Sequence, residues 1–80
     1  MIKRIKKIST RDLIQYLVKK LSFYVFKQEG SHIQLIQANN PRNDVTVPWR
    51  KEIGQGTLNS TFAQIGYPIQ DFYAWCNKRR

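Results

Sequence analysis

The chain has 80 residues and carries 14 lysines and arginines against 5 acidic residues, which gives a formal net charge of +9. This length holds one domain, while one cysteine and one histidine exclude an internal disulfide and a metal cluster of these two residue types. No stretch approaches the roughly 18–20 apolar residues of a membrane helix, and no apolar signal-peptide segment follows the basic start. We therefore expect a soluble, cytoplasmic, single-domain protein of residues 1–80, with no metal, no cofactor and no membrane association.

The strong positive charge indicates what kind of partner the protein binds. Lysine and arginine in such excess attract phosphate backbones and acidic protein surfaces over long distances. The alternative interpretation is that the charge only keeps a small domain soluble. We favour a nucleic acid or an acidic protein as the partner, and the two do not exclude each other.

The first predicted element is a helix over about residues 10–21. It follows a basic lead-in, residues 1–8, in which lysine and arginine alternate with isoleucine. Ser9 or Thr10 provides an N-cap, and Ser9 with Asp12 three residues later resembles a capping box. Apolar residues then recur at helical spacing, and these are Leu13, Ile14, Leu17, Val18 and Leu21.

A first strand is predicted over residues 23–26, because aromatic and β-branched residues favour a pleated, partly buried surface. Alternation of side chains predicts that Phe23 and Val25 face the core. Tyr24 and Phe26, on the other face, either stack against nucleobases or help to cover the sheet. We favour the second interpretation.

A turn over residues 28–31, in which Gly30 can adopt a positive φ, leads to a second strand over about residues 32–38. Alternation predicts that one face of this strand carries Ile33, Leu35 and Gln37 and the other His32, Gln34 and Ile36. Residues 39–43 are rich in asparagine and predict another turn. A short third strand over residues 44–47 ends at the following proline. The three strands are predicted to form an antiparallel meander.

The last third of the chain predicts two helical segments. After a loop over residues 49–55, a helix begins near Gly56 and ends at Gly66, with apolar residues Leu58, Phe62 and Ile65. Pro68 begins a further helical turn, whose apolar residues are Ile69, Phe72, Tyr73 and Trp75. Residues 77–80 form a basic tail. The predicted fold class is α+β, in the order α-β-β-β-α, with helices on one face of the sheet as in double-stranded-RNA-binding domains.

His32 is the only histidine of the chain, and it follows Gly30-Ser31 at the start of the second strand. An imidazole can both accept and donate a proton near neutral pH. Taken alone, a histidine at a strand edge is more often an exposed polar residue than a catalytic one. A resemblance of the surrounding motifs to a known family favours the catalytic interpretation.

The order of several short motifs resembles that of the HicA toxins, small ribonucleases of toxin–antitoxin pairs. The motifs span about residues 5–75 and are Ile8-Ser9, Leu21-Ser22-Phe23, Lys27-Gln28-Glu29-Gly30-Ser31-His32, Val45-Thr46-Val47-Pro48, Gly56-Thr57-Leu58, Gly66 and Asp71-Phe72. The resemblance implies a double-stranded-RNA-binding-like fold, cleavage of mRNA that inhibits translation, and catalysis by the histidine of Gly-Ser-His, which is His32. It also implies a HicB-type antitoxin that binds the toxin and blocks its site. Where many members carry a second histidine after Val-Pro, this chain has Trp49-Arg50-Lys51.

RNA cleavage by the 2′-hydroxyl requires a proton acceptor, a proton donor and stabilisation of charge on the phosphate. His32 can serve as either acceptor or donor. The second carrier is then a lysine, a glutamate, water or a residue of another subunit, as in a homodimer. No carboxylate cluster with ligand-like spacing indicates metal-dependent cleavage. Candidate RNA-binding residues are Lys27, Gly30, Ser31, Arg50 and Lys51.

Two other functions fit the same residues. A non-catalytic RNA-binding module would use the same charge without depending on His32, and a protein-interaction domain would present it only to an acidic partner. Arg50 and Lys51 are as often solvated loop charge as RNA contacts. Trp49 either stacks on an unpaired base or packs against the second helix, and we favour packing.

Overall fold

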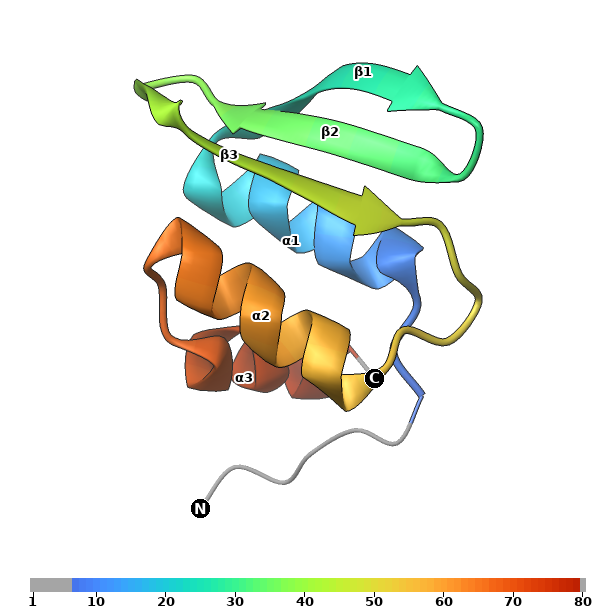
Figure 1. Ribbon diagram of the computed structural model, residues 1–80. Coiled ribbons are helices and arrows are strands. Elements are labelled where there is room, and N and C mark those ends of the chain that lie inside the picture. The colour runs from blue at the N-terminus through green and yellow to red at the C-terminus, as the bar shows by residue number, and fades with distance from the viewer. Residues whose placement is uncertain (1–6, 80) are drawn as a thin grey trace.

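A three-stranded sheet covers a layer of helices in the computed structural model, which describes residues 7–79 (Figure 1). The elements are α1 (Thr10–Leu21), β1 (Phe23–Glu29), β2 (His32–Gln37), β3 (Asn40–Pro48), α2 (Gln55–Ile65) and α3 (Ile69–Arg79). The strands run antiparallel in the order β1-β2-β3. Helices α1 and α2 pack against one face of the sheet, and α3 packs against these two helices. The predicted α+β class and meander are confirmed, while the basic lead-in falls largely outside the described residues.

Helix α1 begins and ends where its sequence predicts. The hydroxyl of Ser9 accepts a hydrogen bond from the main-chain N–H of Asp12 at 3.1 Å, and the Asp12 carboxylate accepts one from the N–H of Ser9 at 3.1 Å, which completes a capping box. Ser22, in the left-handed conformation, ends the helix by donating its N–H to the carbonyl of Leu17. Val18 of the predicted apolar stripe is exposed, because the buried face is made by Thr10, Leu13, Tyr16 and Leu17.

Strands β1 and β2 form a hairpin that is closed by the two-residue turn Gly30-Ser31. Gly30 has a φ of +58°, a conformation that glycine adopts without steric cost. The predicted alternation of β2 is confirmed, since its buried residues are Ile33, Leu35 and Gln37. The other side of β2, which we call the open face of the sheet, carries His32, Gln34 and Ile36.

The predicted burial of Val25 is wrong. Val25 pairs with Leu35 and points to the helical side of the sheet, but 47% of its surface is exposed. Strand β1 lies at the edge of the sheet, and only its first residue, Phe23, joins the core. Tyr24 and Phe26 are also exposed.

Strand β3 is longer than predicted, because it begins at Asn40 and confines the turn to residues 38–39. The side-chain amide of Asn43 donates hydrogen bonds to the Gln37 side chain at 3.1 Å and to a main-chain oxygen at the end of α2 at 3.0 Å. These bonds connect β3 to β2 and α2. They outweigh the turn preference of an asparagine-rich segment.

The C-terminal region is more helical than predicted. Helix α2 ends at Gly66, whose φ of +80° fits the predicted stop, but α3 is a complete helix of 11 residues and includes residues 77–79 of the predicted tail. Its Arg79 forms an ion pair with Asp12 of α1 at 3.3 Å. The same guanidinium lies 4.3 Å from the ring centre of Trp75. These contacts hold the end of α3 against α1.

The core lies between the sheet and the helices. The sheet contributes buried aliphatic side chains, chiefly Ile33, Leu35, Val45 and Val47. Each of the three helices contributes at least one ring to a helical aromatic cluster, which consists of Tyr16, Phe62, Phe72 and Trp75. This packing fixes the helices beneath the sheet and leaves the open face to solvent.

Candidate functional site

His32 is exposed at the first position of β2, on the open face of the sheet. Its cross-strand neighbours are Glu29 of β1 and Pro48 of β3. Residues that lie directly opposite each other on antiparallel strands have Cβ atoms about 4.5–5.5 Å apart. The imidazole therefore stands beside a carboxylate at the hairpin end of the sheet.

A β-bulge determines which β1 side chains accompany His32. The pairing shifts register between Val25 and Lys27, which leaves Phe26 as the extra residue. In a regular strand, Lys27 and Glu29 would point toward the helices, whereas after the bulge they share the open face with His32. Lys27 Nζ lies 3.5 Å from Glu29 Oε1. An ammonium, a carboxylate and an imidazole are thus gathered on one surface.

The hairpin turn is joined to the segment that follows β3. The main-chain N–H of Trp49 donates to the carbonyl of Ser31 at 2.6 Å, and the side-chain amide of Gln28 donates to the carbonyl of Gly30 at 3.4 Å. These four residues line a cavity of about 360 Å³. Gly30 and Ser31, both predicted as RNA-binding residues, lie at its wall.

Thr10 connects the start of α1 to the same segment. Its buried hydroxyl donates to the carbonyl of Pro48 at 2.6 Å and accepts from the N–H of Arg50 at 2.9 Å. Its own N–H donates to the carbonyl of Arg50 at 3.0 Å. The backbone around Trp49 is therefore held from both sides, while the side chains of Arg50 and Lys51 are exposed.

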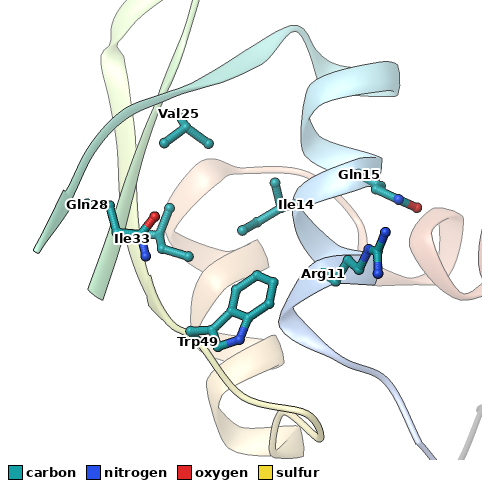
Figure 2. Close-up of a pocket in the computed structure, with 7 residues that line it drawn as sticks. All are labelled: Arg11, Ile14, Gln15, Val25, Gln28, Ile33 and Trp49. Atoms are coloured by element: carbon teal, nitrogen blue, oxygen red, sulfur yellow. The ribbon is translucent and has the colours of Figure 1, made fainter. Parts of the chain in front are cut away.

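The sequence favoured packing of Trp49 against the second helix, whereas the structure places its side chain beside α1 and the hairpin. Its side chain is 49% exposed and lies in a groove between α1 and the β1–β2 hairpin, which we call the α1–hairpin groove (Figure 2). The groove has a volume of about 330 Å³, and its other lining residues are Arg11, Ile14, Gln15, Val25, Gln28 and Ile33. Trp49 lies beside α1 because the hydrogen bonds of Thr10 hold the end of β3 next to the start of this helix.

The structure gathers most of the predicted site residues at one end of the molecule. Lys27, Gly30, Ser31 and His32 lie at the hairpin end, and Arg50 follows Trp49 beside them, with Lys51 further along an exposed loop. Sequence reasoning missed Arg11 and Gln28. Arg11 lines the same groove as Trp49 although the two are far apart in the chain, which leaves no local signal in the sequence. Gln28 faces the groove because of the bulge.

The exposed charges at this end are mostly positive, with Arg11, Lys27, Arg50 and Lys51 against Glu29 and Glu52. Such a surface attracts phosphate groups. Within residues 7–79, no group of three or more histidine, cysteine or acidic side chains could hold a metal ion. The helices of this described part include none that is long and apolar enough to cross a membrane.

Fold and site together define a class of protein, namely a basic α+β domain with the element order α-β-β-β-α-α and a histidine on the open face of its sheet. The family model described as the HicA toxin of bacterial toxin-antitoxin matches residues 10–67, which is more than half of the chain. The chain therefore belongs to the HicA toxin family. No curated protein and no solved structure matches it.

Proposed function

We propose that the protein is a metal-independent endoribonuclease that cleaves mRNA, inhibits translation, and uses His32 as its catalytic residue. The observation that carries this proposal is the exposed imidazole of His32 on the open face, directly across from Glu29 and close to the Lys27–Glu29 ion pair. Membership of a toxin family supports the same activity. The mostly basic surface of this end supports a polyanionic substrate.

The proposed reaction needs no group beyond those at the hairpin end. The 2′-oxygen attacks the adjacent phosphorus, the bond from phosphorus to the 5′-oxygen breaks, and the products are a 2′,3′-cyclic phosphate and a 5′-hydroxyl. One proton leaves the 2′-hydroxyl and one reaches the 5′-oxygen. His32 carries one of these transfers and Glu29 the other, while Lys27 stabilises negative charge on the non-bridging oxygens.

Cleavage of a long mRNA in the presence of EDTA tests the proposal. His32→Ala is expected to lower the rate by about 10²–10⁴-fold, the usual contribution of a general acid or base. Thr46→Ala is the matched control, since Thr46 is exposed on the open face of β3 and pairs with Gln34, and its rate is expected to stay unchanged. Equal cleavage by wild type and His32→Ala, or none by wild type in EDTA, contradicts the proposal.

Binding without cleavage would instead favour a non-catalytic RNA-binding module. In that case His32→Ala retains the affinity of the wild type, while Lys27→Gln and Arg50→Gln weaken binding and reduce its salt dependence. Filter binding at several salt concentrations distinguishes the two functions.

A HicB-type antitoxin is the proposed protein partner, and it would inhibit the enzyme by covering His32. The exposed side chains of the hairpin end support this, because a bound protein there would exclude RNA. Co-purification with the product of the adjacent gene tests the partner, and the mass of the purified chain in solution tests whether it forms a homodimer. A partner that leaves cleavage unaffected would contradict inhibition at this site.

A further inference from the structure

We propose that the α1–hairpin groove binds one unpaired nucleobase of a single-stranded RNA, which stacks on Trp49 while Arg11 contacts its phosphate. The proposal rests on the proposed function, because it names the form of RNA that reaches His32. It assigns a ligand to the part of the surface that the reaction at His32 does not use.

The groove has the composition of a site for a small, flat ligand. Ile14, Val25 and Ile33 give it apolar walls, while Gln28 adds a polar side chain from the hairpin. Small-molecule sites are commonly apolar clefts with a few polar groups that fix the orientation of the ligand, and about 300 Å³ is the lower end of their size range. At about 330 Å³, the groove suits one base rather than a larger ligand.

Trp49 is an exposed residue on a backbone that hydrogen bonds hold on both sides. Tryptophan is highly buried on average, yet about half of this side chain remains open to solvent. The main-chain N–H of Trp49 donates to the carbonyl of Ser31, and the residues before and after it are bonded to Thr10. Because the backbone is already held, stacking of a base has to order only the side chain of Trp49, so binding costs less conformational entropy.

Charge and hydrogen-bonding groups favour RNA over an acidic protein as the occupant. None of the described residues that line the groove is acidic. Arg11 offers a guanidinium to a phosphate, and the side-chain amide of Gln28 can donate to and accept from the edge of a base. An acidic peptide would use the charge but would leave the flat indole without a matching ring.

The groove and His32 lie on the two sides of the same hairpin end. His32 pairs with Pro48, which directly precedes Trp49, and Gln28 lines both the groove and the cavity at the turn. An RNA chain that crosses the Gly30-Ser31 turn can thus insert a base on one side and present a neighbouring phosphate to His32 on the other. Bases in a duplex are stacked on each other, so this arrangement selects single strands.

Fluorescence of Trp49 tests the proposal directly. The chain has two tryptophans, and Trp75→Phe leaves Trp49 as the only one. The probe is a short 2′-O-methyl oligouridylate, which lacks the attacking hydroxyl and cannot be cleaved. We expect it to quench Trp49, and an RNA duplex of the same length to leave the emission unchanged.

Affinity of a labelled probe, measured by anisotropy, completes the test. Trp49→Ala is expected to weaken binding by about 5- to 140-fold, the range that corresponds to loss of one stacked base, whereas Trp49→Phe retains most of the affinity. Phe26→Ala is the matched control, because Phe26 is an exposed aromatic residue outside the groove, and it is expected to bind as the wild type does. Removal of one base from the probe should reproduce the loss seen with Trp49→Ala.

Three outcomes of the fluorescence experiment overturn the proposal, and they are independent of cleavage. These are no response of Trp49 to the single strand, an equal response to the duplex, and an equal response to an oligoglutamate of the same charge, which would indicate an acidic protein as the occupant. If the enzyme does not cleave mRNA but its binding depends on Trp49, the nuclease fails and the base site stands. If His32-dependent cleavage persists and Trp49→Ala binds the probe as tightly as the wild type, the base site alone fails.

Discussion

The aromatic residues of the helical layer differ from those of the sheet in how much of their surface reaches solvent. The rings of the helical aromatic cluster pack against one another, with ring centres 5.2 to 6.4 Å apart. Tyr24, Phe26 and Trp49, which we call the surface aromatic group, each expose about half of their surface. The same residue types thus serve two roles in one small domain.

The difference shows that topology, rather than residue type, decides what an aromatic side chain does here. Three helices converge on the helical aromatic cluster, and each packed ring pair adds about 0.5–1.5 kcal/mol beyond the burial of its surface. The surface aromatic group lies on an edge strand and on the segment after β3, where about half of the surface of each residue stays open to solvent. The first group stabilises the fold, and the second is free to meet a ligand.

The largest expected effect comes from Phe72, which is fully buried and contacts Tyr16, Phe62 and Trp75. Phe72→Ala is expected to lower the free energy of unfolding by about 3–5 kcal/mol, because it removes a large buried ring and leaves a cavity. Urea denaturation followed by circular dichroism measures this change.

The control is Phe26→Ala, the same substitution in the surface aromatic group, for which we expect a change within about 0.5 kcal/mol. If Phe72→Ala is too unstable to purify, Phe72→Leu provides a smaller and measurable loss. Similar losses for Phe72→Ala and Phe26→Ala would mean that the two aromatic groups do not differ in role.

A smaller effect on stability is expected from Thr10. The backbone around Trp49 is held by hydrogen bonds of Thr10, whereas the helical aromatic cluster is held by contacts between rings. Thr10→Val keeps the shape of the side chain and the main-chain bond to the Arg50 carbonyl, but it removes the two hydroxyl bonds, to the carbonyl of Pro48 and from the N–H of Arg50. Loss of hydrogen bonds at a buried site costs about 1–3 kcal/mol, and the Trp49 indole should also become more mobile. Urea denaturation and the time-resolved anisotropy of Trp49, in a Trp75→Phe background, measure the two effects.

Thr46→Val provides the matched control, since Thr46 is exposed on β3. Neither the stability of this variant nor the anisotropy of Trp49 is expected to change. An unchanged anisotropy in Thr10→Val would show that the rigidity of Trp49 does not depend on this anchor.

Local signals were sufficient to predict α1 and the end of α2, whereas α3, the third helix of the helical aromatic cluster, was predicted only as a helical turn. The capping pair Ser9 and Asp12 predicts the start of α1, and Gly66 predicts the end of α2. The strict alternation of β2 predicts which of its residues are buried. Each of these signals acts over a few residues, so the sequence alone contains it.

The surface aromatic group and the candidate site depend on contacts that no local signal specifies. The bulge at Phe26 turns Lys27 and Glu29 onto the face of His32, but a run of aromatic and β-branched residues does not reveal which one is extra. Trp49 reaches α1 because of hydrogen bonds made by Thr10, far away in the chain. His32 could be predicted as a candidate from its motif, whereas its neighbours had to come from the fold.

The smallest expected effect on stability comes from ionisation of Tyr16, and it is absent at neutral pH. Tyr16 is the one member of the helical aromatic cluster that can ionise. Burial raises the pKa of its phenol above the usual 10.0, and the negative charges of Asp71 and of ionised Cys76 raise it further. An unfolded chain therefore releases this proton at a lower pH than the folded protein does. Stability is unaffected below about pH 10 and falls as the pH rises from there through the higher pKa of the folded state.

Tyr16→Phe keeps the ring and removes the ionisable hydroxyl, so it is expected to lose less stability than the wild type between about pH 9 and pH 11. Urea denaturation at both values measures the difference, and the lysines that titrate in the same range contribute equally to both proteins. Tyr24→Phe, in the surface aromatic group, is the matched control. If both variants changed the pH dependence equally, burial of the cluster would not be its cause, because Tyr24 lies outside that cluster.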